Sequence, residues 1–150
     1  MTGARAQLDL VVKQAIVNCS PERAFAVYTR EMSIWWPFAT HSVGDHTDRA
    51  VIEERPGGRM YEVEADGSEH PWGTVTVWDP PHRLAVAWRV NPDALAATEV
   101  EITFTAAGDG RTEVRLEHRG WELLADPAAS RDGYDEGWEA VFGAYLAALV

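Results

Sequence analysis

The chain has 150 residues, of which 46% are hydrophobic and 25% are charged, a composition that disfavours intrinsic disorder and suits one domain over residues 1–150. Its formal net charge of −11 disfavours nucleic-acid partners and anionic lipid headgroups, because both carry negative charge. Cys19 is the only cysteine, which excludes an intramolecular disulfide and a Cys-rich zinc site.

The beginning of the chain carries no sign of export. Its first ten residues contain no long apolar run, and no stretch of the sequence approaches the roughly 20 apolar residues of a membrane helix. We therefore expect a cytoplasmic protein with no membrane partner.

A strand followed by two short helices is predicted for the first quarter of the chain. Residues 8–17 are rich in Val and Ile, as in a strand. Ser20, Pro21 and Glu22 then predict a helix start, because Ser caps free backbone N–H groups and Pro suits the first helical position. This helix should end near residue 30. The aromatic segment 31–38 follows, and its Pro37 limits any helix there to a short turn.

Six consecutive strands are predicted from residue 49 onward, because short β-rich runs alternate with Gly, Pro, Asn and Asp turn signals. These runs cover residues 49–55, 59–65, 72–78, 83–90, 98–105 and 111–119. Tight turns between consecutive strands indicate an antiparallel meander. In the run 72–78, period-2 alternation would place Trp72, Thr74, Thr76 and Trp78 on one face.

The last two strands show the clearest alternation. Val100, Ile102 and Phe104 share one face of the first, and Glu and Thr occupy the other. Leu116 and His118 continue the apolar face in the second strand. One face of this sheet should therefore be packed and the other exposed to water.

The end of the chain changes to a helical period. Ser130 or Asp132 is a candidate cap for this helix. Apolar residues then recur at i, i+3, i+4, i+7, i+8 and i+11, which places on one stripe Trp138, Val141, Phe142, Tyr145, Leu146 and Leu149. The only large apolar partner for this stripe is the packed face of the sheet. We therefore predict an α+β fold in which a curved antiparallel sheet of six to seven strands wraps a long C-terminal helix and leaves a cavity.

Over nearly its whole length the sequence resembles the SRPBCC or START-like superfamily, in the branch named for homologues of the activator of heat-shock-protein ATPase. The resemblance rests on motifs in a shared order: Pro21 with Phe25, Trp35-Trp36-Pro37, Pro56-Gly57-Gly58-Arg59 with Glu62, Trp72-Gly73-Thr74-Val75, Pro80-Pro81-His82-Arg83-Leu84 with Trp88, Thr98-Glu99-Val100, His118-Arg119-Gly120-Trp121 and Gly133-Tyr134 with Gly137-Trp138. It implies a helix-grip fold. It also implies a protein that binds lipids, hormones, polyketides or aromatic compounds, with a few relatives that catalyse cyclisation. It does not imply chaperone activity, since fold does not fix function.

Two polar residues stand out on the strands. Alternation directs His118 toward the helix, either as a hydrogen-bonded core histidine or as a donor to a ligand. The strand pattern leaves open the face on which Glu62 lies, and the resemblance favours the inner one. A buried carboxylate needs a partner, for which His118 or Arg89 is a candidate. If Glu62 met His118, the two would form an acid–base pair.

The predicted function is binding of a small hydrophobic or aromatic molecule between the sheet and the C-terminal helix. The alternatives are an enzyme of the cyclase or hydrolase type that acts on a similar molecule, and a protein-interaction module related to chaperone ATPase activators. A homodimer remains compatible with the sequence. The expected pocket residues are Trp35, Trp36, Phe38, Glu62, Trp72, Trp88, His118, Trp138 and Phe142.

No cofactor or metal ion is expected. The sequence has no Gly-x-Gly-x-x-Gly motif and no P-loop, so nucleotide cofactors are not predicted. A zinc site from His41, His46 and Asp48 would lack a recognised ligand spacing. No serine lies in a nucleophile-elbow motif, which leaves a serine hydrolase without support.

Overall fold

A seven-stranded antiparallel sheet forms the frame of the fold, and the computed structural model describes residues 10–91, 93, 94 and 96–150. Its spatial order is β1-β7-β6-β5-β4-β3-β2, so the first strand pairs with the last. The strands are β1 (Val11–Val17), β2 (Thr47–Ile52), β3 (Arg59–Glu64), β4 (Glu69–Asp79), β5 (Arg83–Trp88), β6 (Thr98–Gly108) and β7 (Arg111–Arg119). The predicted meander is confirmed. Leu8, Asp9 and Pro92, which fall in the predicted first strand and in a predicted turn, lie outside the described residues.

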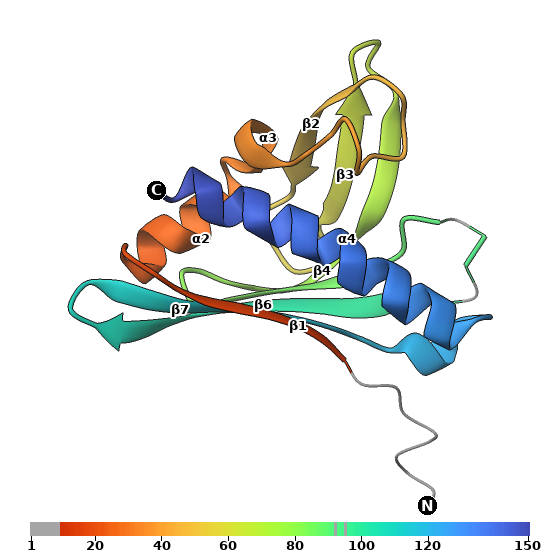
Figure 1. The fold of residues 1–150 in the computed structure, drawn as a ribbon. Helices are drawn as coiled ribbons and strands as arrows, with labels where there is room; N and C mark the ends of the chain where they lie inside the picture. Colours follow the sequence, from red (N-terminus) through yellow and green to blue (C-terminus); the bar gives the residue numbers. More distant parts are fainter. Residues whose placement is uncertain (1–9, 92, 95) are drawn as a thin grey trace, which may run out of the picture.

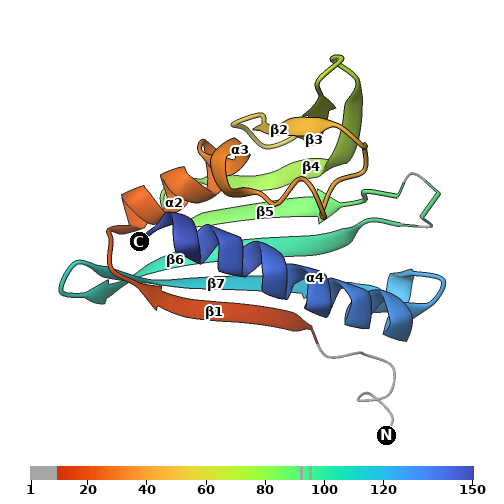
Figure 2. The same cartoon turned by 45° about the horizontal axis from the view of Figure 1, so that its top comes forward.

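Within the residues given above, three helices and one 3-10 turn accompany the sheet. They are α2 (Pro21–Thr29), α3 (Met32–Trp35), η1 (Trp121–Leu123) and α4 (Pro127–Ala148). The sheet curves around α4, with β2, β3 and β4 rising beside the helix while β1, β6 and β7 pass beneath it (Figures 1 and 2). The predicted helix-grip arrangement, with two short helices after the first strand, is therefore confirmed.

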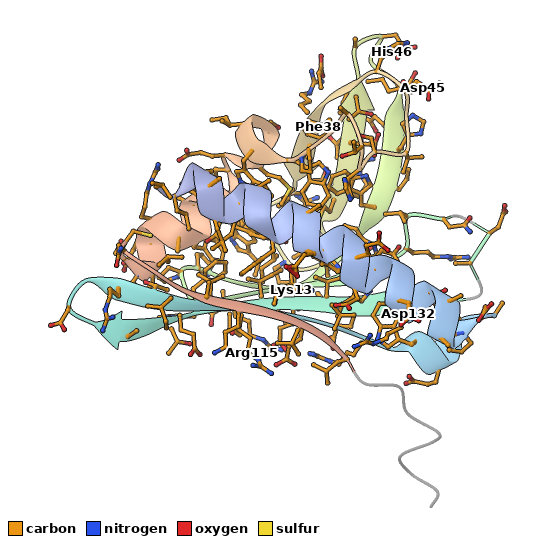
Figure 3. The ribbon with its side chains drawn as sticks, viewed as in Figure 1. Lys13, Phe38, Asp45, His46, Arg115 and Asp132 are labelled. Carbon is orange, nitrogen blue, oxygen red and sulfur yellow. The ribbon has the colours of Figure 1, made fainter. Side chains whose placement is uncertain are left out.

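The core lies between α4, α2 and the concave face of the sheet. Strict alternation on β6 and β7 pairs Val100 with His118 and Ile102 with Leu116, and all four side chains are buried. The opposite face carries the charged residues, and Arg115 projects from it on the side of the sheet away from α4 (Figure 3). The sequence pattern therefore predicted the inward face of these strands correctly.

Helix α4 buries the centre of its apolar stripe. Trp138, Val141, Phe142 and Tyr145 are buried, and Tyr145 donates its hydroxyl proton to the carbonyl of Ala24 at 2.8 Å, which ties α4 to α2. Leu146 and Leu149, at the end of the stripe, are only partly buried.

The predicted start of this helix was wrong. The helix begins at Pro127, and the carboxylate of Asp126 accepts the N–H of Ala129 at 3.3 Å. Ser130 and Asp132 lie inside the first turns instead of capping them. A cap with Pro directly after it fits the preference of Pro for the first helical position. In the part of the chain that the structure describes, no helix has the length and apolar character that a membrane crossing requires.

Candidate functional site

A cavity of about 200 Å³ lies between α4, strands β3 to β5 and the segment that joins α3 to β2. Aromatic side chains dominate its lining, and among the described residues Glu62 is the only one that brings a carboxylate to it. The lining residues are Trp36, Thr40, His41, Ser42, Val43, Glu62, Trp72, Trp88, Val90, Tyr134, Gly137, Trp138 and Val141.

Four of the lining residues are tryptophans that contact one another in a closed cycle, which we call the tryptophan ring: Trp36, Trp72, Trp88 and Trp138. The ring centroids of successive members are 4.6 Å apart for Trp36 and Trp72, 5.7 Å for Trp72 and Trp88, 5.5 Å for Trp88 and Trp138, and 6.1 Å for Trp138 and Trp36. Tilted and edge-on contacts at these distances are the favourable geometries for aromatic pairs. The members come from α3's end, β4, β5 and α4, so the ring forms only in the folded chain.

An irregular strand aims Trp72 into the cavity. The pairing of β3 with β4 shifts between Met60 and Tyr61, so that Trp72 has no direct partner across the ladder. Such a bulge changes the face on which the following residues lie. Gly73 at this point has no side chain, and a Cβ there would lie 2.2 Å from the carbonyl oxygen of Ala87.

A second register shift in β4 lies between Val75 and Val77. With both shifts, Trp72 is buried and Trp78 is partly buried, while Thr74 and Thr76 are exposed. The simple alternation predicted for this strand, with all four side chains on one face, was therefore wrong.

Glu62 lies on β3 with its side chain fully buried, on the inner face that the resemblance favoured. Its Oε1 accepts the N–H of Val43 and the indole N–H of Trp72, each at 2.7 Å. Its Oε2 accepts the N–H of Gly44 at 2.9 Å and the hydroxyl proton of Thr47. Both oxygens are thus occupied by two donors each, which matches the acceptor capacity of a carboxylate.

The hydrogen bonds to Glu62 favour the ionised form of its carboxyl group. Burial raises the pKa of its carboxyl group, but the donors from Thr47, Val43, Gly44 and Trp72 outweigh burial and hold the pKa below its usual value. Glu62 is therefore an ionised, fully bonded group at neutral pH. It is suited to fixing the loop that carries Val43 and Gly44, and has no free lone pair for a substrate proton.

His118 is not a lining residue of the cavity, but it contacts the tryptophan ring through Trp138. Its Nδ1 accepts the indole N–H of Trp138 at 2.9 Å, so Nε2 carries the proton and donates it to Oγ1 of Thr98 at 2.6 Å. Oγ1 of Thr98 in turn lies 3.4 Å from the carbonyl oxygen of Trp88. Burial and, to a smaller extent, the charge of Arg119 lower the pKa of His118 to about 3. The imidazole is therefore neutral, and it holds two ring members in place.

The acid–base pair considered for Glu62 and His118 does not form. Each oxygen of Glu62 and each ring nitrogen of His118 is bonded to another group, and these groups differ between the two residues. Alternation directed His118 to the inner face, and the resemblance favoured the same face for Glu62, but neither could show that different partners hold the two side chains apart.

Five of the nine expected pocket residues line the cavity: Trp36, Glu62, Trp72, Trp88 and Trp138. The other four do not. Trp35 donates its indole N–H to the carbonyl of Val27 at 2.7 Å, and Phe142 packs against Tyr145 in the core. Phe38 lies in the segment after α3, partly buried against the core (Figure 3).

Several lining residues were not expected in the pocket from the sequence, and those on α4 accompany Trp138, which was expected. Tyr134, Gly137, Trp138 and Val141 line the cavity from α4 at the spacing i, i+3, i+4 and i+7, which is one face of a helix. This spacing was visible in the sequence. Thr40, His41, Ser42 and Val43 come from the polar segment before β2, and no pattern in the sequence indicated that it covers the cavity. Within the described ranges, no three His, Cys, Asp or Glu side chains come together as a metal site.

Solved structures of similar fold include two with a stated activity. One is Txn09, described as an anthrahydroquino-gamma-pyrone synthase, which is 30% identical, with a TM-score of 0.62 over 97% of this chain and 99% of that chain. The other is CalC from Micromonospora echinospora, a self-sacrificing resistance protein, which is 26% identical, with a TM-score of 0.71 over 93% of both chains.

A third similar structure, MLL2253 from Mesorhizobium loti, is 19% identical with a TM-score of 0.67 over 92% of this chain and 94% of that chain, and shows the fold alone. No curated protein matches the chain. The family model described as activator of Hsp90 ATPase homolog 1-like protein matches residues 18–150. The chain therefore belongs to this family, within the START-like superfamily of helix-grip proteins.

Proposed function

We propose that this protein binds a small aromatic molecule in the cavity, against the tryptophan ring. The observation that carries the proposal is the ring itself, four indoles that line a cavity whose only carboxylate among the described residues is already bonded to four protein donors. Flat apolar walls with few free polar groups favour a flat apolar ligand.

The volume of the cavity limits the size of the ligand. A cavity of about 150 Å³ is enough for benzene, whereas sites for drug-sized ligands measure about 300–1,000 Å³. At about 200 Å³, this cavity suits a molecule of one or two fused rings, or the end of a larger ring system that extends through the mouth.

The similarity to Txn09 favours a second candidate, an enzyme that acts on such a molecule. A cyclisation catalyst of this kind would use the tryptophan ring to fold and orient its substrate. Glu62 and His118 would not serve as its acid and base, because their proton-accepting atoms are already bonded. Catalysis in this chain would therefore rest on positioning, with Tyr134 and His41 as the titratable side chains left at the cavity.

Binding can be tested with indane, a two-ring hydrocarbon, in an NMR titration that follows the tryptophan indole N–H signals. We expect saturable shifts of the signals of the ring members. The matched variants are Gly137→Leu, whose side chain would enter the cavity, and Gly143→Leu, which lies on the exposed side of the same helix. Binding should be lost in the first and kept in the second.

Two outcomes would contradict the proposal: no saturable shift in the unmodified protein, or equal binding by Gly137→Leu and the unmodified protein. Native mass spectrometry of the freshly purified protein provides a search for a retained molecule. Conversion of that molecule on incubation would favour the enzyme, and its release unchanged would favour the binding protein.

A further inference from the structure

Nearly all polar atoms at the cavity are bonded within the protein. The indole N–H groups of the tryptophan ring donate to the His41 carbonyl, to Glu62, to the Tyr134 hydroxyl and to His118, in the order Trp36, Trp72, Trp88 and Trp138. The hydroxyl of Ser42 donates to the carbonyl of Phe38. A ligand in the cavity therefore finds few groups with which to form a hydrogen bond.

The hydroxyl of Tyr134 is different. Its oxygen accepts the indole N–H of Trp88 at 3.2 Å, and because an indole nitrogen only donates, the hydroxyl proton is not used in this contact. Among the described residues, no acceptor for that proton is found. Burial raises the pKa of Tyr134, to a greater extent than the contact with Trp88 lowers it, so the group keeps its proton at neutral pH.

The hydroxyl of Tyr134 lies next to the tryptophan ring. Tyr134 lies one helical turn before Trp138 on α4, and its oxygen is within hydrogen-bond distance of the Trp88 indole. The Nε2 atom of His41 is a second polar side-chain atom at the cavity with no hydrogen-bond partner among the described residues, and it lies 3.9 Å from where a Cβ on Gly137 would be. Of the two, Tyr134 is the one whose polar atom contacts a member of the tryptophan ring.

The charges at the cavity also limit which chemical groups a ligand can carry. Glu62 has no free lone pair for an amine or a cation, and it would repel an anionic ligand. The hydroxyl of the partly buried Tyr134 can donate its proton to an acceptor on the ligand. A neutral oxygen acceptor on an aromatic framework meets both conditions.

Resting on the proposed function, we propose that the natural ligand is a neutral aromatic carbonyl compound, whose carbonyl oxygen accepts the hydroxyl proton of Tyr134 while its rings pack against the tryptophan ring. Tyr134 is then the residue that selects for the oxygen, and the tryptophans select for the flat framework.

The test compares 1-indanone with indane, which differ in one carbonyl group, by the same NMR titration. Tyr134→Phe should weaken binding of 1-indanone about five- to tenfold, the effect of one hydrogen bond, and change binding of indane less than twofold. Tyr61→Phe, the same substitution on the sheet outside the cavity lining, should leave both affinities unchanged. Because indane cannot use the hydroxyl, it also reports any change in cavity shape caused by Tyr134→Phe.

The outcomes separate the two proposals. If both compounds bind but Tyr134→Phe affects them equally, or affects neither, oxygen recognition by Tyr134 is wrong while the aromatic site stands. If neither compound shifts the indole signals of the unmodified protein, the aromatic site itself is wrong, and the carbonyl proposal is wrong with it.

Discussion

The indole N–H of Trp72 donates to Oε1 of Glu62 at 2.7 Å, and the same oxygen accepts the backbone N–H of Val43 at the same distance. One buried carboxylate therefore joins the wall of the cavity, through Trp72, to the segment that covers it, through Val43 and Gly44. The contact between the sheet, the loop and the tryptophan ring therefore depends on the single carboxylate of Glu62. This makes Glu62 the most informative residue to substitute.

Glu62→Gln is expected to destabilise the protein by about 3 kcal/mol, because the amide keeps the shape of the carboxylate but leaves buried donors without an acceptor. Urea denaturation measures the free energy of unfolding. Hydrogen exchange provides a second measurement, in which the amides of Val43 and Gly44 should exchange faster in the variant than in the unmodified protein.

The control is Glu69→Gln on the next strand, where an exposed pair with Arg59 at 3.1 Å should contribute less than about 1 kcal/mol. A Glu62→Gln variant as stable as the control, with unchanged exchange at Val43 and Gly44, would contradict the role of the carboxylate in holding the loop.

Mild acid should destabilise the protein through His118. Burial lowers its pKa from 6.5 to about 3 in the folded state, so between these values the unfolded chain binds a proton that the folded chain does not. The free energy of unfolding is therefore unaffected by this group above pH 6.5. It should fall as the pH decreases toward 3, by up to about 1.4 kcal/mol per pH unit.

Urea denaturation at pH 7, 6 and 5 measures this slope. His118→Gln should reduce the slope, since Gln keeps an acceptor for Trp138 and a donor for Thr98 but does not titrate.

His70→Gln is the control. The neighbouring Glu64 raises the pKa of His70, so that group contributes stability at low pH that is lost as the pH rises through the raised pKa. His70→Gln should therefore not flatten the acid slope. An equal slope in His118→Gln and the unmodified protein would exclude His118 as its source.

Strict periodicity explains what the sequence predicted well. On β6 and β7 every second residue is buried, because one face of the sheet packs against the helices and the other meets water, so Val100, Ile102 and His118 were assigned to the right face. The inward position of His118 was predictable for this reason. Its role was not, because its partners Trp138 and Thr98 come from different elements of the chain.

Irregular backbone explains much of what the sequence missed. The two register shifts in β4 alter which residues face inward, so alternation placed Thr74 and Thr76 on the same face as Trp72, whereas Trp72 is buried and both threonines are exposed. The position of the segment before β2 depends on Glu62, a residue about twenty positions later, and no local pattern encodes that contact. Helical spacing also encoded the face of α4 that carries Tyr134 and Gly137. The prediction instead followed the larger apolar stripe beside that face.

Asp126→Ala should destabilise the protein by about 1 kcal/mol, because the side chain of Asp126 accepts the N–H of Ala129 at the start of α4. Ser130→Ala, at a position that the sequence suggested as the cap, is the matched control and should change stability by less than about 0.5 kcal/mol. Thermal and urea unfolding of both variants decide between the two caps. A larger loss in Ser130→Ala than in Asp126→Ala would restore the cap expected from the sequence.

Gly73→Ala tests the bulge that aims Trp72 into the cavity. A Cβ at this position would lie 2.2 Å from the carbonyl oxygen of Ala87, and since both atoms belong to paired strands, β4 and β5 must separate or the bulge must move. We expect a loss of about 2–3 kcal/mol in urea denaturation, together with weaker binding of indane, because Trp72 would leave its place in the tryptophan ring. Gly133→Ala, on the exposed side of α4 with open space around it, should instead stabilise the protein by up to about 1 kcal/mol through better helix propensity. A Gly73→Ala protein with unchanged stability and unchanged indane binding would show that the bulge does not require glycine and that another contact orients Trp72.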